Sequence, residues 1–272
     1  MSFYKYISYL YILLVPLNLM AVTAHDSTRE CVDSVSGFNF FFKPTQESKC
    51  DLPIMPELNK FDQAVLDLCG SWGDKPKIEG FRHMLDDVKY KEYIDKIYTE
   101  LDHQVFSPNA DLETFKRELA RLWFRRRGFT HIMCGEPRKN RLAGMHFFGR
   151  YIQAQQNGWA GRYYHPSDEV SDKIFTVGII FKNPYSNRLI IDNRKGYDLS
   201  HADDIIIYAT KAYKGLSQSI NLTTNKFCLY EYNGITYSLV ASKDAIVTFF
   251  SDLTPSCRAG KGECNCIKDT IS

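Results

Sequence analysis

Gly128-Phe-Thr-His131-Ile-Met-Cys-Gly-Glu136, followed by Leu142-Ala-Gly144-Met-His146, is the stretch at which this chain changes character. Before it, apolar residues recur at helical spacing; after it, apolar runs alternate with turn signals. Two histidines fifteen positions apart cannot share one face of a short helix. We therefore expect two short strands, or a strand–loop–helix turn, to fold His146 back against His131. Such a pair can supply a base and an acid near neutral pH.

The part before the histidines is predicted to be helical, from Glu57 to Arg127. Its strongest helix follows Asp111, a residue type that caps helix N-termini. The apolar residues that follow Asp111 have helical spacing and are expected to face the core: Leu112, Phe115, Leu119, Leu122 and Trp123.

The part after the histidines is predicted to alternate strands with helices. We expect helices at residues 147–156 and 200–214, the second starting at Ser200 and ending at Gly215, and strands at 173–181, 188–191, 227–232, 235–240 and 245–250. The Asn233-Gly234 pair is a strong hairpin signal. The fold class is therefore α+β, a helical N-terminal part followed by antiparallel sheets with interspersed helices.

The composition indicates a globular protein: 272 residues, of which 44% are hydrophobic and 24% charged. A formal net charge of +2 excludes a strongly basic coat for nucleic acid. Positive charge is nevertheless clustered near the histidines, at Lys116, Arg117, Arg121, Arg125, Arg126, Arg127, Arg138, Lys139 and Arg141. Such a cluster is usually a solvated face, and a polyanionic partner is the alternative.

Residues 1–24 have the pattern of a secretory signal peptide: a lone cation at Lys5, an apolar run, and the small-residue site Val22-Thr-Ala24. A retained membrane anchor is the alternative, which Pro16 and Asn18 disfavour. We therefore expect a secreted protein, periplasmic or extracellular, with no stable membrane association after cleavage. No later stretch is long and apolar enough to span a bilayer.

All eight cysteines follow the signal segment, and an even number in an exported protein indicates disulfides. Cys31–Cys50 is the obvious local pair, within an irregular N-terminal arm expected at residues 25–58. The tail at residues 253–272 holds Cys257, Cys264 and Cys266, which could form a metal knuckle. Because no histidine accompanies them, disulfides are favoured there.

The two histidine motifs resemble those of the EndoU family of endoribonucleases, which includes animal, nidoviral and bacterial members. The resemblance extends upstream to the predicted helix at residues 111–124, and downstream to residues 243–250. It covers roughly residues 60–252, and we expect an EndoU-like domain at residues 59–252.

The resemblance implies cleavage of RNA on the 3′ side of uridines, leaving a 2′,3′-cyclic phosphate. His146 would take the proton from the 2′-hydroxyl, and His131 would protonate the departing 5′-oxygen. The family also uses a lysine on the second strand of the hairpin after the histidines. Counting along the hairpin places this cation at Arg188, with Lys195 as the alternative; we favour Arg188.

The base-reading positions of the family fall near Asp192 and Phe250 in this chain, so the resemblance implies substrate binding there. Phe250 can stack on a base but has no hydroxyl group, and Asp192 accepts hydrogen bonds only when ionised. Glu136 could orient His131 or hold a divalent cation, manganese or calcium.

Three functions remain open on the sequence. The first is a secreted endoribonuclease with RNA as its partner. The second is a catalytically inactive EndoU-like module that binds RNA or a protein through its basic helix. The third is a disulfide-stabilised extracellular interaction module. An unidentified protein partner or inhibitor is compatible with each.

Overall fold

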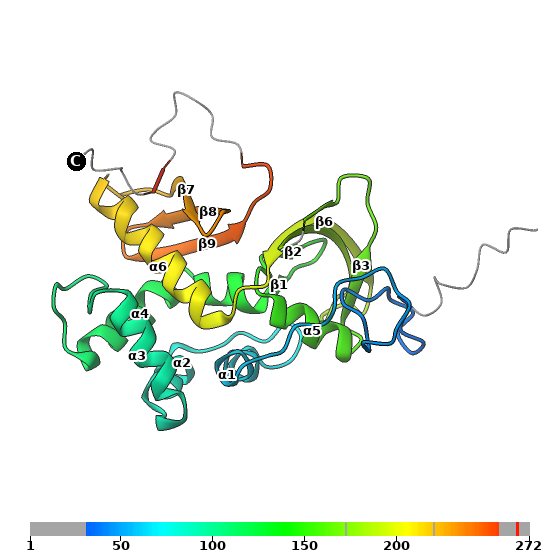
Figure 1. Ribbon diagram of the computed structural model, residues 1–272, viewed down its shortest axis with the longest axis horizontal. Coiled ribbons are helices and arrows are strands. Elements are labelled where there is room, and N and C mark those ends of the chain that lie inside the picture. The colour runs from blue at the N-terminus through cyan, green and yellow to red at the C-terminus, as the bar shows by residue number, and fades with distance from the viewer. Residues whose placement is uncertain (1–30, 172, 220, 256–264, 267–272) are drawn as a thin grey trace, which may run out of the picture.

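The computed structural model describes residues 31–171, 173–219, 221–255 and 265–266, and Figure 1 shows their arrangement. The helices of the first part are α1 (Lys60–Cys69), α2 (Ile78–Asp86), the 3-10 turn η2 (Val88–Tyr90), α3 (Lys91–Glu100) and α4 (Leu112–Phe124). The second part contains the π-helical turn η3 (Thr130–Cys134), β1 (Glu136–Pro137), β2 (Leu142–Ala143), α5 (Phe148–Gln156), β3 (Ala160–Tyr163), β4 (Glu169–Val170), β5 (Ile174–Lys182), β6 (Leu189–Asp198), α6 (Ala202–Ser219), β7 (Lys226–Tyr232), β8 (Ile235–Ser242) and β9 (Ala245–Ser251). The predicted α+β class is confirmed.

All three sheets of the described residues are antiparallel. In the largest, β5 pairs with β6 on one edge and with both β3 and β4 on the other. The second sheet has the order β7-β8-β9, and β1 and β2 form a separate short hairpin. Helix α6 lies between the β7-β8-β9 sheet and α3, so it connects the strand-rich part of the chain to the helical part (Figure 1).

Local signals explain where the helices begin. The Asp111 side chain accepts a hydrogen bond from the Thr114 N–H, which confirms it as the N-cap of α4. Asn59 caps α1 in the same way and forms a capping box with Asp62. The predicted apolar stripe of α4 faces the core, where the Trp123 indole donates to Thr210 of α6 at 3.2 Å.

Two elements are longer than predicted. Strand β6 continues to Asp198, well beyond the predicted residues 188–191. Its exposed residues include the apolar Leu189 and Ile191, while its partly buried ones include the polar Asp192, so this strand lacks the regular alternation of a half-buried strand. Helix α6 begins at Ala202 and continues through Gly215, which was predicted to end it, because Leu216 remains buried in the core.

Three disulfides join the described cysteines: Cys31–Cys50, Cys69–Cys134 and Cys228–Cys266. The predicted local pair, Cys31–Cys50, is confirmed. Cys266 is bonded to Cys228 on β7 and is therefore no metal ligand, whereas Cys257 and Cys264 lie outside the described residues. The predicted signal peptide at residues 1–24 also lies outside them. Among the described residues, no helix has both the length and the apolar character needed to cross a membrane.

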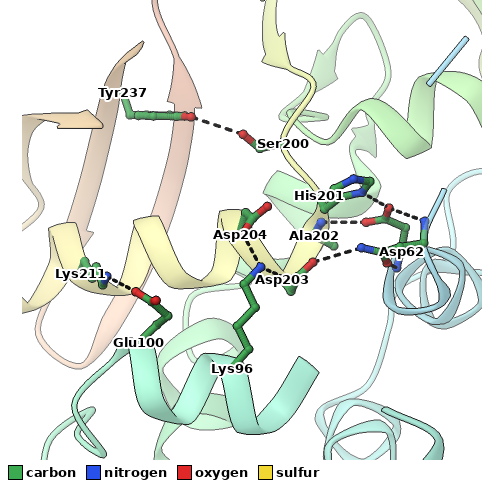
Figure 2. Close-up of polar contacts among 11 residues, drawn as sticks. Asp62, Lys96, Glu100, Ser200, His201, Ala202, Asp203, Asp204, Lys211 and Tyr237 are labelled. Atoms are coloured by element: carbon green, nitrogen blue, oxygen red, sulfur yellow. Dashed lines mark hydrogen bonds and ion pairs between the residues drawn. The ribbon is translucent and has the colours of Figure 1, made fainter. Parts of the chain in front are cut away.

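A polar cluster fixes the start of α6 against α1 and α3, as Figure 2 shows. Asp62 of α1 is fully buried and accepts hydrogen bonds from the Ala202 N–H at 2.7 Å and from His201 Nδ1 at 2.5 Å. Lys96 of α3 lies 2.6 Å from Asp203 and 2.7 Å from Asp204. Acidic side chains in the first turn of α6 also interact favourably with the helix dipole. This anchor sets where β6 ends, since β6 leads directly into α6.

Candidate functional site

The π-helical turn Thr130–Cys134 brings the two histidines together. The Met145 N–H donates to the His131 carbonyl, and the His146 N–H donates to the Ile132 carbonyl, both at 2.7 Å. These two hydrogen bonds lay the chain before α5 directly against the turn. As a result, the imidazole rings of His131 and His146 have their centroids 5.6 Å apart. Both side chains are partly exposed to solvent.

Gly144 permits this close approach. Its φ of +69° lies in the left-handed region, and a Cβ atom at this position would lie 1.9 Å from the carbonyl oxygen of His131. No residue with a side chain fits there. The next residue, Met145, also has a positive φ, of +74°, and the buried Tyr151 hydroxyl donates to its carbonyl at 2.7 Å. Glycine at position 144 and the tyrosine of α5 thus fix the chain that carries His146.

The buried Arg150 of α5 supports the other end of the π-helical turn. Its guanidinium donates to the carbonyls of Cys134, Gly70 and Ser71 at 2.9 to 3.1 Å. Burial lowers the pKa of Arg150 to about 10, so it remains charged at neutral pH. The Cys69–Cys134 disulfide crosslinks the same turn to α1. The segment carrying His131 is therefore held by covalent and polar contacts with two helices.

His146 lies where β6 and β9 cross. Its Nδ1 is 2.7 Å from the Gly196 carbonyl oxygen, and because a carbonyl only accepts, Nδ1 carries the proton. Nε2 of the neutral ring is therefore an acceptor. Phe250 of β9 stacks on the imidazole with ring centroids 5.0 Å apart and planes 23° apart. A Cβ atom at position 196 would lie 2.7 Å from the Ser251 carbonyl oxygen, so this crossing also requires glycine.

The surroundings of His146 keep its ring neutral. Removal from water, the charge of His131 and the charge of Lys195 together lower the pKa of His146 to about 3, against the opposing effect of the Gly196 carbonyl. At neutral pH the ring therefore holds one proton, on Nδ1. That is the state that a general base requires.

The Nδ1 atom of His131 contacts a carboxylate, whereas that of His146 contacts a neutral carbonyl. Nδ1 of His131 lies 3.3 Å from Oε2 of Glu136, a carboxylate that also contacts Arg138 at 2.9 Å and Arg127 at 3.6 Å. The hydrogen bond with His131 and the charge of Arg138 lower the pKa of Glu136 to about 2, despite its partial burial. An ionised carboxylate only accepts hydrogen bonds, so Nδ1 of His131 is the donor of this contact, and Glu136 places a negative charge beside the ring.

The structure places the two candidate cations differently. Lys195 lies next to Gly196 on β6, with Nζ 3.1 Å from Asp192, and it is close enough to lower the pKa of His146. Arg188 lies in the exposed β5–β6 turn, where its carbonyl accepts from the Asn183 N–H. Eight residues of extended strand separate it from Gly196, roughly 25 Å along β6 and several times the reach of an arginine side chain. This placement does not support the preference for Arg188.

The predicted base-reading residues already have partners within the chain. Asp192 accepts from the Leu142 N–H at 2.7 Å and pairs with Lys195, so it links the β1–β2 hairpin to β6. Phe250 stacks on His146. Phe250 therefore lies directly beside a histidine, and both carboxylate oxygens of Asp192 already accept hydrogen bonds within the chain.

A divalent cation at Glu136 does not fit these contacts. Oε2 faces His131 and Arg138, and Oε1 faces Arg127, so the carboxylate is surrounded by positive partners. Across the described residues, no three His, Cys, Asp or Glu side chains are grouped as a metal site would need.

Two residues of the site were missed by sequence analysis. Gly196, which supplies the carbonyl for His146, could have been suspected because a glycine inside a strand often marks a close backbone approach. Arg150 gave no signal, since an arginine in an amphipathic helix is ordinarily exposed. Its burial depends on three carbonyls from segments distant in sequence.

The fold and the site together define an α+β protein with a two-histidine centre suited to acid–base chemistry. Residues 125–253 match the model of a known family, the bacterial EndoU nucleases. The resemblance to the EndoU family that the histidine motifs indicated is therefore confirmed over this segment.

Two solved structures resemble the chain more distantly. XendoU, described as a splicing-independent, snoRNA-processing endoribonuclease, is 13% identical with a TM-score of 0.45 over 72% of this chain and 77% of that one. Endoribonuclease Nsp15 of Middle East Respiratory Syndrome Coronavirus is 17% identical with a TM-score of 0.34, over 53% of this chain and 38% of that one. Among curated proteins, no match to the chain was found.

Proposed function

We propose that this protein is an endoribonuclease that cleaves RNA by attack of a 2′-hydroxyl on the neighbouring phosphodiester. The observation that carries the proposal is the contrast between two adjacent imidazoles: the proton of His146 is held on Nδ1 by a carbonyl, while Nδ1 of His131 faces an ionised carboxylate. One ring can accept a proton while the other donates one. The match of residues 125–253 to bacterial EndoU nucleases supports the same chemistry.

In the proposed reaction, Nε2 of His146 takes the proton of the 2′-hydroxyl. The 2′-oxygen then attacks phosphorus, forming the second ester bond of a 2′,3′-cyclic phosphate. His131 delivers its Nε2 proton to the 5′-oxygen as the P–O5′ bond breaks. The reaction consumes no water, and it leaves His146 protonated and His131 neutral until they exchange protons with solvent.

Lys195 is the cation that we propose for the charge on the phosphate oxygens. Its side chain is only 12% exposed, and Asp192 restrains its amino group. A cation held in place before the reaction stabilises negative charge better than one that must be ordered during it.

Uridine preference and secretion complete the proposal. Uridine preference rests on the resemblance to the EndoU family. Secretion rests on the signal-like residues 1–24, and the three disulfides are compatible with an extracellular protein.

The test is cleavage of a short, fluorogenic, uridine-containing RNA by the wild type and by His146→Ala. We expect kcat to fall by about a hundred- to ten-thousand-fold in the variant, since that is the usual contribution of a general base. His165→Ala, which removes an imidazole from the loop between β3 and β4, is the matched control and should cleave normally.

Equal cleavage by the wild type and His146→Ala would refute the assigned role. A wild type that binds RNA in a salt-dependent way but cleaves nothing would instead favour the catalytically inactive EndoU-like module.

A further inference from the structure

A basic groove lies between α2 and α4, beside the histidine site. Its volume is about 720 Å³, and one carboxylate and several apolar side chains, among them Phe124, also line it. Six cationic side chains line this groove: Lys75, Arg82, Arg117, Arg121, Arg125 and Arg127. All six are exposed. In a chain whose formal net charge is only +2, this is a local concentration of positive charge.

Much of this charge is not neutralised within the protein. In the part of the chain that the structure describes, Lys75 and Arg82 form no ion pair, and Arg117 bonds to the neutral Thr114 hydroxyl. Arg121 and Arg125 share a single carboxylate, that of Asp244. The groove therefore has an excess of positive charge available to an anionic ligand.

The acidic residue of the groove is already engaged. Glu118 accepts hydrogen bonds from the backbone N–H groups of Phe106 and Ser107 and from the Ser107 hydroxyl, at 2.6 to 3.0 Å. These contacts direct its carboxylate oxygens toward the chain before α4. Beyond Arg117, Asp86 and Glu113 both pair with Lys116 at 3.0 Å, so the excess positive charge ends there.

The other end of the groove reaches the catalytic pair on the side of His131. Lys75, Arg127 and Thr130 line both the groove and a smaller pocket of about 190 Å³, and that pocket is also lined by Glu136. Glu136 is the carboxylate bound to His131. The positive surface therefore runs from the partner of the proposed general acid to the middle of α4.

Phe124 gives the groove a second feature that suits a single strand. Its ring is half-buried against Phe81 and Phe129 and lies between the arginines. Aromatic rings among cations bind single-stranded nucleic acid, because bases stack on the rings while phosphates meet the charges.

We propose that this groove binds the single-stranded RNA that follows the scissile bond on its 3′ side. This inference rests on the proposed function, in which His131 protonates the 5′-oxygen. That oxygen belongs to the first nucleotide of the 3′ product, so a groove extending from the His131 side holds the nucleotides that come after it. Lys75, Arg82, Arg117 and Arg121 precede residue 125, so they lie outside the segment that matches the bacterial EndoU nucleases. Four of the six cations that line the groove are therefore supplied by the helical part of this chain.

The test uses three RNA substrates with the same scissile step: a dinucleotide, the dinucleotide extended by about five nucleotides on the 3′ side, and the dinucleotide extended equally on the 5′ side. Each is cleaved by the wild type and by Arg82→Gln/Arg117→Gln. The control is Lys60→Gln/Lys226→Gln, which removes two exposed charges that do not line the groove.

We expect the 3′ extension to raise the kcat/KM of the wild type at least about tenfold, and Arg82→Gln/Arg117→Gln to lose most of this gain while cleaving the dinucleotide normally. For the 3′-extended RNA, the slope of log kcat/KM against log salt should become shallower by about 1.4, because two fewer phosphates are neutralised. The control should behave as the wild type does.

A gain from the 3′ extension that survives in Arg82→Gln/Arg117→Gln would overturn the inference, as would a loss confined to the 5′-extended RNA. An unchanged response to every RNA would leave an acidic protein partner as the better explanation of the groove. Failure of the proposed function is distinguishable, since the wild type would then cleave none of the three substrates.

Discussion

In the proposed mechanism, His131 and His146 take different roles because their Nδ1 atoms have different partners. A backbone carbonyl at Nδ1 of His146 can only accept, so it fixes the tautomer without adding a negative charge. A carboxylate at Nδ1 of His131 adds a full negative charge, and Glu136 keeps that charge because the hydrogen bond with His131 and the guanidinium of Arg138 lower its pKa. The carbonyl of Gly196 and the carboxylate of Glu136 are therefore the two groups that would make one imidazole a proton acceptor and the other a proton donor.

Substituting the two candidate cations separately tests which of them acts on the phosphate. Lys195→Ala should lower kcat by about a hundredfold or more, because a positioned cation against developing charge contributes on this scale. Arg188→Ala should leave kcat within about twofold of the wild type, since its side chain lies in the exposed turn. Single-turnover cleavage of saturating RNA measures both. A large loss in Arg188→Ala alone would mean that β6 does not position the site as described.

At the scale of elements, the site depends on where β6 stops and α6 starts. Asp62 receives hydrogen bonds from both the His201 imidazole and the Ala202 N–H, so it caps α6 from a different helix. The hydrogen bond to Asp62 raises the pKa of His201 above its usual 6.5. The folded protein therefore binds the proton of His201 more tightly than the unfolded chain does.

The pH dependence of stability follows from this shift. The hydrogen bond between protonated His201 and Asp62 adds to the free energy of unfolding. This stabilisation is fully present below about pH 6.5, and it is lost as pH rises through the raised pKa of His201 in the folded protein. His201→Gln should therefore lower the free energy of unfolding more at pH 5.5 than at pH 9. Because the side chain is 40% exposed, the difference should be only a few tenths to about 1 kcal/mol. Urea unfolding of both proteins at the two pH values measures it; a larger cost at pH 9 would contradict the assignment.

The lowered pKa of His146 does not affect the comparison between the wild type and His201→Gln. A lowered pKa in the folded state means that the unfolded chain binds the proton first, so stability falls as pH drops below about 6.5. This effect is present in both proteins and cancels between them.

Comparison of the elements shows what sequence patterns could and could not predict. Residues 111–124, 147–156 and 227–240 were predicted well, because capping, helical spacing and Asn233-Gly234 are local signals. Strand β6 was cut short because its inward side chains, Asp192 and Lys195, are polar. A strand with polar side chains on its inner face loses the alternation by which strands are identified, and counting along the shortened strand favoured Arg188 over Lys195.

In the whole molecule, the candidate site lies where the helical part and two of the sheets meet. His131 belongs to a turn crosslinked to α1, the partner carbonyl of His146 belongs to β6, and Phe250 belongs to β9 of the other sheet (Figure 1). No single segment of the chain carries all the groups of the candidate site. Contacts that hold these parts together should therefore affect both stability and catalysis.

Removing one disulfide tests this dependence. Cys69→Ala/Cys134→Ala should cost about 4 kcal/mol of stability, from a crosslink that spans 65 residues, and should also lower kcat because the turn carrying His131 loses its tie to α1. Cys31→Ala/Cys50→Ala, spanning 19 residues, is the control: it should cost about 3 kcal/mol and leave kcat unchanged. Thermal unfolding and cleavage are measured on the same preparations. Unchanged kcat in the first variant would show that the disulfide does not position the site.

The proposed role of His146 is tested by cleavage of an RNA in which the scissile nucleotide alone carries 2′-deoxyribose, with the products identified by mass spectrometry. If His146 activates the 2′-hydroxyl, the all-ribose RNA yields a 2′,3′-cyclic phosphate and a 5′-hydroxyl, and the 2′-deoxy RNA stays intact at that position. Cleavage of the 2′-deoxy RNA at the same bond, or a product ending in a 5′-phosphate, would contradict the account.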